Sequence, residues 1–231
     1  LGDIVINEIA WAGTSDDSND EWIELYNPTS QEVDLSGWFI EDDVTTKYTI
    51  ASGKIAAHGY FLIEDKEDSV KNLTANAIIG LSLANAGDSL VLKDSAGGTV
   101  DSANISGGAW YAGNATDKAT MERVDPLVKV DSAANFGSAV SGNGATGING
   151  GSILGTPAGA NSVYAGSGPT VVMNGATASI GENVTVSVDA KDTVDLYGYG
   201  FEINYDPTVL SYVSATESSF LKADGNETSF S

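Results

Sequence analysis

The 231-residue chain contains no cysteine, and this absence excludes disulfide bonds, thiolate metal sites and cysteine redox chemistry. Histidine is nearly absent as well. The single histidine, His58, precedes Gly59 in a predicted turn, so neither a Ser-His-Asp triad nor a zinc site of His and Cys has residues to build on. No glycine motif that cradles phosphate ends in Lys-Ser or Lys-Thr. We therefore expect a protein that is not an enzyme.

Basic residues are scarce too: 10 Lys and Arg stand against 32 Asp and Glu, for a formal net charge of −22. Because phosphate binding needs clustered Lys and Arg, this surface excludes nucleic acid and anionic membranes as partners. No run of about 20 apolar residues occurs, so we expect no membrane insertion.

What the chain does contain is typical of β-structure. Glycine is frequent, at 27 residues, and the residues between the glycines are rich in Val, Ile, Thr and aromatics. Short strands joined by Gly, Asn and Asp turns have this composition, and no long stretch carries apolar residues at helical spacing. The fold class that we expect is all-β, with many short strands in a sandwich or barrel.

The clearest strand is Glu21–Tyr26, in which Ile23 and Leu25 point to one side and Trp22 and Glu24 to the other. Asn27-Pro28 ends it. Further strands are expected at Leu1–Ile9, Val33–Ile40 with a turn at Ser36-Gly37, Tyr48–Ile50, Tyr60–Ile63, Ser89–Leu92 and Thr99–Asp101.

The composition changes after Ser132, where large apolar residues become rare, and we interpret 132–167 as a long terminal loop that leads into a linker. We expect a first domain over 1–162, a linker over 163–169 and a second domain over 170–231. The strands expected in the second domain are Thr177–Ile180, Asn183–Ala190, Tyr197–Tyr205 and Leu210–Val213.

Ordered motifs of the first domain resemble those of the lamin-tail domain. They are Ile6-Asn7-Glu8-Ile9, Glu21–Pro28, Val33–Trp38, His58–Leu62, Leu83–Leu92, Met121–Pro126 and Gly155–Asn161. The resemblance covers about 160 residues and implies an immunoglobulin-like β-sandwich.

The second domain resembles the first part of a cohesin domain, on Gly181–Val186, Leu196–Ile203 and Tyr205–Leu210. This implies a partial jelly-roll sandwich and a dockerin-like protein partner. Half a sandwich leaves strand edges unpaired and one apolar face bare. We therefore expect it to pack on the first domain or to form a homodimer by strand exchange.

One loop concentrates oxygen ligands and is a candidate Ca²⁺ site. The expected ligands are Asp16, Ser18, Asp20 and Glu21, flanked by Glu8 on the preceding strand. The loop is not an EF-hand, because the sixth position counted from Asp16 is Glu21 rather than Gly. A merely hydrated loop is the alternative.

Aromatic residues suggest a second candidate surface. Trp22 and Trp38 lie on expected strands and are interpreted as core residues. Trp110 and Tyr111 lie in a Gly-rich segment, where exposed rings would contact a glycan or a protein.

The two resemblances imply a non-catalytic extracellular binding or scaffolding module of a prokaryotic surface or secreted protein. The alternative is an accessory, carbohydrate-binding module of a larger secreted hydrolase, with polysaccharide as its partner. Neither reading names the ligand.

Overall fold

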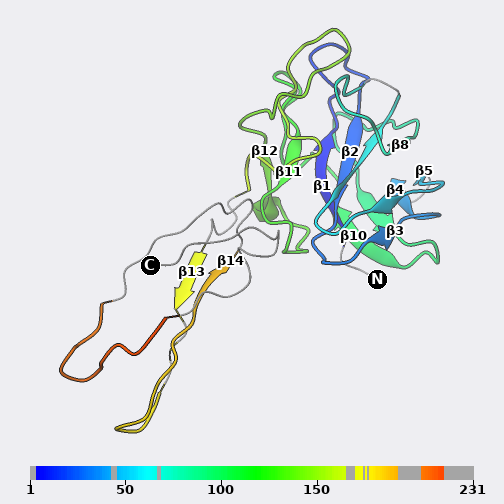
Figure 1. Cartoon of the computed structure of the whole chain (residues 1–231). Helices are drawn as coiled ribbons and strands as arrows, with labels where there is room; N and C mark the ends of the chain where they lie inside the picture. Colours follow the sequence, from blue (N-terminus) through cyan, green and yellow to red (C-terminus); the bar gives the residue numbers. More distant parts are fainter. Residues whose placement is uncertain are drawn as a thin grey trace. The chain divides into compact units, whose positions relative to one another are not determined.

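The computed structural model describes residues 4–42, 46–66, 69–164, 170–173, 175, 177–191 and 204–215. The chain divides into two compact units, Leu1–Gly166 and Ser167–Ser231. Both are built from strands (Figure 1), and among the described residues the single helical element is a 3₁₀ turn at Ala133–Asn135. The all-β fold class expected from the sequence is confirmed. No helix in the described ranges is long and apolar enough to cross a membrane.

The larger sheet of the first unit has six strands in the order β12-β11-β1-β2-β7-β8. In that order they are Phe136–Ser138, Met121–Arg123, Val5–Ala10, Trp22–Tyr26, Tyr60–Glu64 and Ala77–Ile78. All neighbours are antiparallel except β7 and β8, which run parallel.

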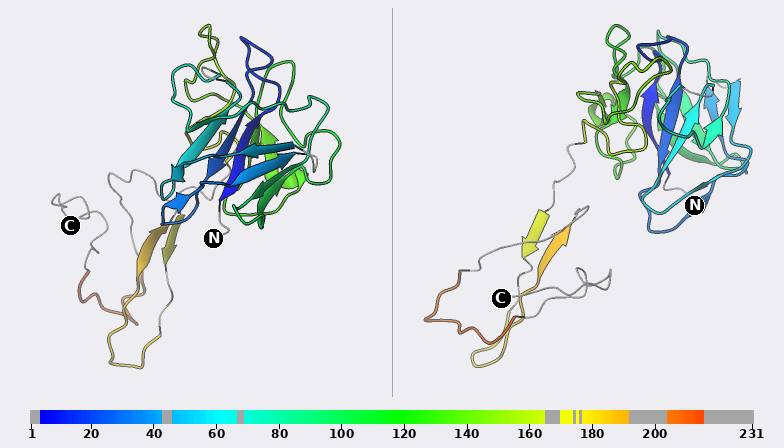
Figure 2. Two further views of the ribbon diagram at one scale, coloured as in Figure 1. Left: turned by 90° about the vertical axis from the view of Figure 1, so that its right-hand side faces the viewer. Right: turned by 45° about the horizontal axis from the view of Figure 1, so that its top comes forward.

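The smaller sheet has four antiparallel strands in the order β10-β9-β4-β5. They are Thr99–Ala103, Leu90–Lys93, Phe39–Asp42 and Thr46–Thr49. A separate short pair joins β3 (Val33–Asp34) to β6 (Lys54–Ile55). Figure 2 shows the strands of the first unit from two further sides.

A hydrophobic core fills the space between these two sheets. Ile23 and Leu25 of β2 and Met121 of β11 contribute from the larger sheet, and Ile40 and Leu92 contribute from the smaller one. These side chains are fully buried. The alternation expected for β2 is confirmed, because Trp22 points the other way, into a second apolar cluster on the outer face of the larger sheet.

One buried ion pair links the two sheets. The Arg123 guanidinium on β11 donates to Asp101 Oδ2 on β10 at 2.6 Å and to the Ile6 carbonyl at 2.8 Å. The same Asp101 oxygen accepts the Ile6 N–H at 2.7 Å. A single carboxylate therefore joins β10 to both β1 and β11.

Residues 139–164 run over the outer face of the larger sheet. Ala145 and Ile153 are buried there against Trp22 and Leu62. The loop expected over 132–167 is thus irregular but packed from 139 to 164, and its first part is wrong, because it contains the strand β12 (Phe136–Ser138). Small residues let its backbone approach the sheet closely: a Cβ on Gly155 would lie 2.6 Å from Glu8 Oε1.

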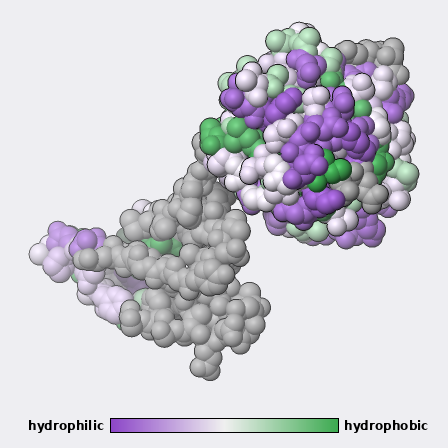
Figure 3. Space-filling model, turned by 90° about the horizontal axis from the view of Figure 1, so that it is seen from above, coloured by the Kyte–Doolittle hydropathy of each residue, from purple (hydrophilic) through white to green (hydrophobic). Residues whose placement is uncertain are grey.

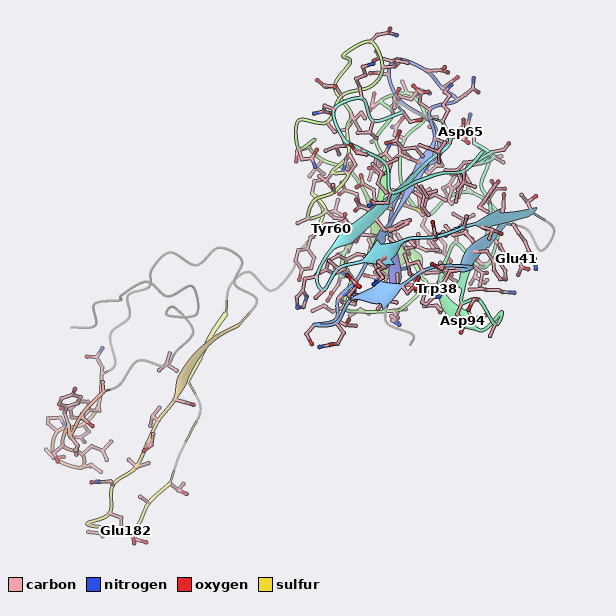
Figure 4. All side chains as sticks on the ribbon, turned by 45° about the vertical axis from the view of Figure 1, so that its right-hand side comes forward. Trp38, Glu41, Tyr60, Asp65, Asp94 and Glu182 are labelled. Carbon is pink, nitrogen blue, oxygen red and sulfur yellow. The ribbon has the colours of Figure 1, made fainter. Side chains whose placement is uncertain are left out.

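The described part of the second unit contains one antiparallel pair, β13 (Thr170–Met173) with β14 (Val188–Lys191). Glu182 lies at the tip of the long connection between them (Figure 4). The expected strands at Thr177–Ile180 and Leu210–Val213 are wrong, and β14 covers only the end of Asn183–Ala190. An alternating sequence forms a strand only when a neighbouring strand accepts its hydrogen bonds. Of Tyr197–Tyr205, positions 197–203 lie outside the described residues.

Candidate functional site

Four of the five residues expected to bind Ca²⁺ are held by separate partners, and the fifth, Ser18, is exposed. Asp16 Oδ2 accepts backbone N–H groups from Asn149 at 2.8 Å and Gly151 at 3.0 Å. Asp20 Oδ1 lies 3.1 Å from the Lys66 ammonium. The contacts of these two carboxylates stabilise the loop itself.

The other three expected ligands lie apart from this pair. Ser18 is exposed, Glu21 Oε2 accepts the Leu83 N–H at 2.9 Å, and Glu8 is buried on the outer face of the larger sheet. No group of three or more His, Cys, Asp or Glu side chains within the described residues is arranged to hold a metal ion. The calcium site stays a prediction, and these contacts do not support it.

Glu21 nevertheless has an unusual environment. Burial raises the pKa of its carboxyl from 4.5 to about 7, and the charges of Asp65, Asp88 and Asp42 add to the rise. Asp42 is the last residue of β4, and Glu21, Asp65 and Asp88 lie within two residues of the ends of β2, β7 and β9. Asp65, labelled in Figure 4, comes directly after β7.

The expected exposure of Trp110 is wrong. The Trp110 ring is 9 % exposed and stacks on Trp11 at 6.0 Å between centroids. Its indole N–H donates to the Ala84 carbonyl at 2.9 Å, so the polar end of the ring is satisfied inside the protein. Tyr111 is half-buried against Phe136. The glycine-rich flanks form turns that fold the segment onto the core, and together the two residues do not form an exposed aromatic platform.

Three buried glutamates form a row across the outer face of the larger sheet. Glu8 of β1 pairs in register with Glu122 of β11 on one side and with Glu24 of β2 on the other. All three side chains are fully buried. We call them the glutamate row.

A β-bulge adds an amide to this row. The register of β1 against β2 shifts between Ile6 and Glu8, which inserts Asn7 as an extra residue. The Asn7 side chain donates to Glu24 Oε1 at 2.9 Å and to Asn161 Oδ1 at 2.8 Å. Asn7 and Glu8 therefore reach the same face of the sheet although they are neighbours in sequence.

Residues 155–163, which we call the strap, cover the glutamate row. Each carboxyl accepts a backbone N–H from the strap: Glu8 from Thr156, Glu24 from Ala158, and Glu122 from Val163. The Thr156 hydroxyl lies 3.2 Å from Glu8 Oε2 and 3.0 Å from Glu122 Oε1, so it bridges two of the carboxyl groups.

Burial and mutual repulsion perturb the row. Desolvation raises the pKa of Glu24 from 4.5 to about 8, and the charge of Glu122 adds to the rise. The pKa of Glu8 is raised well above its ordinary value, first by burial and then by the charges of Glu24 and Glu122. Both carboxyls consequently hold protons at a pH at which exposed glutamates are ionised.

Sequence reasoning singled out Glu8 as a residue flanking the acidic loop, and it did not find the row. The signal that could have found it is a glutamate among apolar residues in each of three strands: Ile-Asn-Glu-Ile, Ile-Glu-Leu and Met-Glu-Arg. Because the strand β11 was not expected, Glu122 was not assigned to the sheet.

Large apolar side chains of the second unit face solvent. Leu210 is 47 % exposed and Tyr212 68 %. Other exposed apolar residues there are Ile180, Val186, Tyr205, Val209 and Val213. The face of the first unit seen in Figure 3 is by contrast mostly hydrophilic, with hydrophobic residues in small separate groups. Five of these seven residues, Tyr205, Val209, Leu210, Tyr212 and Val213, lie within the segment 204–215.

Comparison with protein families finds a match in each part of the chain. Residues 1–107 match the family model of the Lamin Tail Domain, and residues 169–231 match that of the Cohesin domain. The order of families expected from the sequence is confirmed. The first match ends before β11 and β12, which complete the larger sheet. A comparison with curated proteins found no match.

Both families are non-catalytic binding or scaffold modules, which indicates a binding module rather than an enzyme. Cohesin domains bind dockerin proteins, and this supports a protein partner.

Proposed function

We propose that this chain, which matches the family models of the Lamin Tail Domain and the Cohesin domain in that order, is a scaffolding module of a prokaryotic surface or secreted protein. Its second unit binds a dockerin-like protein, and its first unit is a rigid non-catalytic support. The observation that carries this proposal is the Cohesin match over 169–231. Cohesin domains are typically extracellular or on the cell surface, which supports that location.

The exposed apolar side chains of the second unit are suited to such a partner. Protein interfaces concentrate their binding energy in a few aromatic and aliphatic anchors that become desolvated. Tyr212, with Val209 and Leu210 nearby in sequence, supplies residues of this type. The net charge of −22 keeps the remaining surface soluble and favours partners that carry positive charge.

The alternative, a carbohydrate-binding module of a larger hydrolase, was based on an exposed Trp110–Tyr111 platform. Because Trp110 is packed on Trp11, the described structure offers no observation that favours it.

Surface plasmon resonance with the full chain immobilised tests the proposal. A panel of recombinant bacterial dockerins is passed over it in buffer that contains Ca²⁺. We expect at least one to bind, with affinity reduced tenfold or more by Leu210→Asp and by Tyr212→Ser. The matched control is Val140→Ser, which changes a side chain that is 73 % exposed on the first unit. Binding by none of the panel, or equal loss in the control, would contradict the proposal.

A second copy of the chain is the competing occupant of the same face, by strand exchange. Light scattering on the same samples gives the molar mass. A dimer that Leu210→Asp dissociates, and that dockerins do not compete with, would assign the face to self-association instead.

A further inference from the structure

The strap is bound to the sheet by the groups that it hides from water. Three of its backbone N–H groups donate hydrogen bonds to the three carboxyls of the glutamate row. Two strap side chains add to this: Ser162 Oγ donates to Glu122 Oε2 at 2.7 Å, and Asn161 Nδ2 donates to the Arg123 carbonyl at 2.8 Å. Closure therefore depends on the charge state of the row.

Within the described residues, the charges that act most strongly on Glu8 and Glu24 are negative. The charges that act on Glu8 are those of Glu24 and Glu122, and the charge that acts on Glu24 is that of Glu122. The other titratable groups that face the row are the phenols of Tyr26 on β2, Tyr60 on β7 and Tyr164 beyond the strap. Burial raises the pKa of Tyr26 and Tyr60, so both phenols stay neutral while the carboxyls titrate.

Arg123 lies close in sequence to Glu122 but serves the opposite face. Successive side chains of a strand alternate between faces, and the guanidinium binds Asp101 between the two sheets. Thr120, which donates to Glu8 Oε1 at 2.6 Å, is uncharged. Hydrogen bonds from the strap, Asn7 and Thr120 thus favour ionisation of the row, whereas burial and mutual repulsion oppose it more strongly.

We propose that the strap and the glutamate row form a pH-sensitive latch, closed while Glu8 and Glu24 hold protons and opened when these two carboxyls ionise. Opening hydrates the carboxylates and uncovers the outer face of the larger sheet. The strands beneath are tied by continuous backbone ladders on both sides, whereas the strap is tied mainly through side chains, so the strap is the part that yields.

The strap also carries backbone strain that favours opening. Ala158 has a φ of +59°, a left-handed conformation that side chains with a Cβ adopt reluctantly. This conformation aims the Ala158 N–H at Glu24. The hydrogen bond from the Ala158 N–H to Glu24 stabilises this strained conformation.

The direction of the pH effect follows from the raised pKa of Glu24. A carboxyl whose pKa is about 8 when closed and 4.5 when open favours closure fully below about 4.5. As the pH rises from about 4.5 to about 8, this preference for the closed state is lost. Above about 8 the opening equilibrium no longer changes with pH. For one proton, the opening equilibrium increases about tenfold per pH unit in that window. Glu8 titrates with it and steepens the change.

Hydrogen exchange measured by mass spectrometry on the full chain tests the latch. Labelling times between pH 5 and pH 9 are scaled so that the intrinsic exchange of a free amide is constant. We expect protection of the peptide over 155–163 to fall about tenfold or more per pH unit up to about pH 8. The peptide over β2 reports global unfolding and should stay protected.

Two isosteric variants remove the titration one group at a time. Glu24→Gln and Glu8→Gln each replace a carboxyl by a neutral amide that keeps its shape but accepts fewer hydrogen bonds, so the pH slope is the readout rather than the absolute protection. One titrating carboxyl contributes at most about a tenfold change in strap protection per pH unit. We expect each single variant to remove up to that contribution, and the double variant to make strap protection independent of pH. The control is Glu32→Gln, an exposed carboxylate paired with Lys54.

Three results would overturn the latch. They are a strap protected equally at every pH, a strap that loses protection together with β2, and a slope that the glutamine variants leave unchanged. If one variant fails to fold by circular dichroism, the other and the wild-type comparison of the two peptides still decide.

Discussion

Arg123 and Asp101 show how one pair of residues closes the sandwich. Both side chains are almost fully buried, at 0 % and 2 % exposure, and their charges meet at 2.6 Å. Desolvation opposes this arrangement: burial raises the pKa of Asp101 and lowers that of Arg123. The pair is tolerated because the Ile6 N–H and carbonyl complete its hydrogen bonds.

Removing one member of this pair should therefore be costly. We expect Asp101→Ala to lower the free energy of unfolding by about 3–5 kcal/mol, because it leaves the Arg123 charge buried without a partner. Urea denaturation followed by tryptophan fluorescence measures the change.

The matched control for Asp101→Ala is Glu32→Ala. It breaks the Lys54–Glu32 pair, whose 2.7 Å separation is similar but whose side chains are exposed. It should leave the denaturation midpoint nearly unchanged, because water and salt screen the pair. Equal losses from the two substitutions would refute the structural role of the buried pair.

Trp110 illustrates a limit of reading single residues. Neighbouring glycines indicate a turn, but whether the ring turns outward or inward depends on Trp11, 99 positions earlier in the chain. Its partner is set by tertiary structure, and no local pattern in the sequence reveals it.

At the scale of elements, strands with strong alternation were predictable and short ones were not. Five residues of β2 and five of β7 carry clear apolar patterns and were expected at nearly the observed bounds. The strands β6 and β8 have two residues each, and β11 and β12 have three, which is too few for a period of two to be recognised.

The glutamate row could not be predicted for a related reason. Its geometry requires the register of three strands that are distant in sequence and a bulge that shifts one of them. The alternation in Glu21–Tyr26 indicated correctly that Glu24 faces away from the core. The cover of the outer face by residues 139–164 was hidden by their small, polar composition, which is also typical of linkers.

The acidic loop leads to a prediction about calcium. Because Asp16 and Asp20 are already engaged by backbone N–H groups and by Lys66, we expect the melting temperature of the full chain to be the same in millimolar Ca²⁺ as in EGTA. Thermal melting followed by circular dichroism measures it. An upward shift in Ca²⁺ that Asp16→Asn abolishes would instead support the site expected from the sequence.

At the scale of the whole molecule, the two units are built differently. The first has two sheets around one core, and its outer sheet face is covered as well. The described part of the second has one strand pair and many exposed apolar side chains. In the function proposed above, the first unit provides stability and the second provides contact.

The central claim is that the second unit carries the binding and the first supports it. Hydrogen exchange of the full chain, with and without a saturating dockerin from the panel, tests it most directly. The account predicts slowed exchange within residues 170–215 and unchanged exchange in β1, β2 and β7. Protection confined to the strands of the first unit, or a panel in which no dockerin alters exchange anywhere, would contradict it.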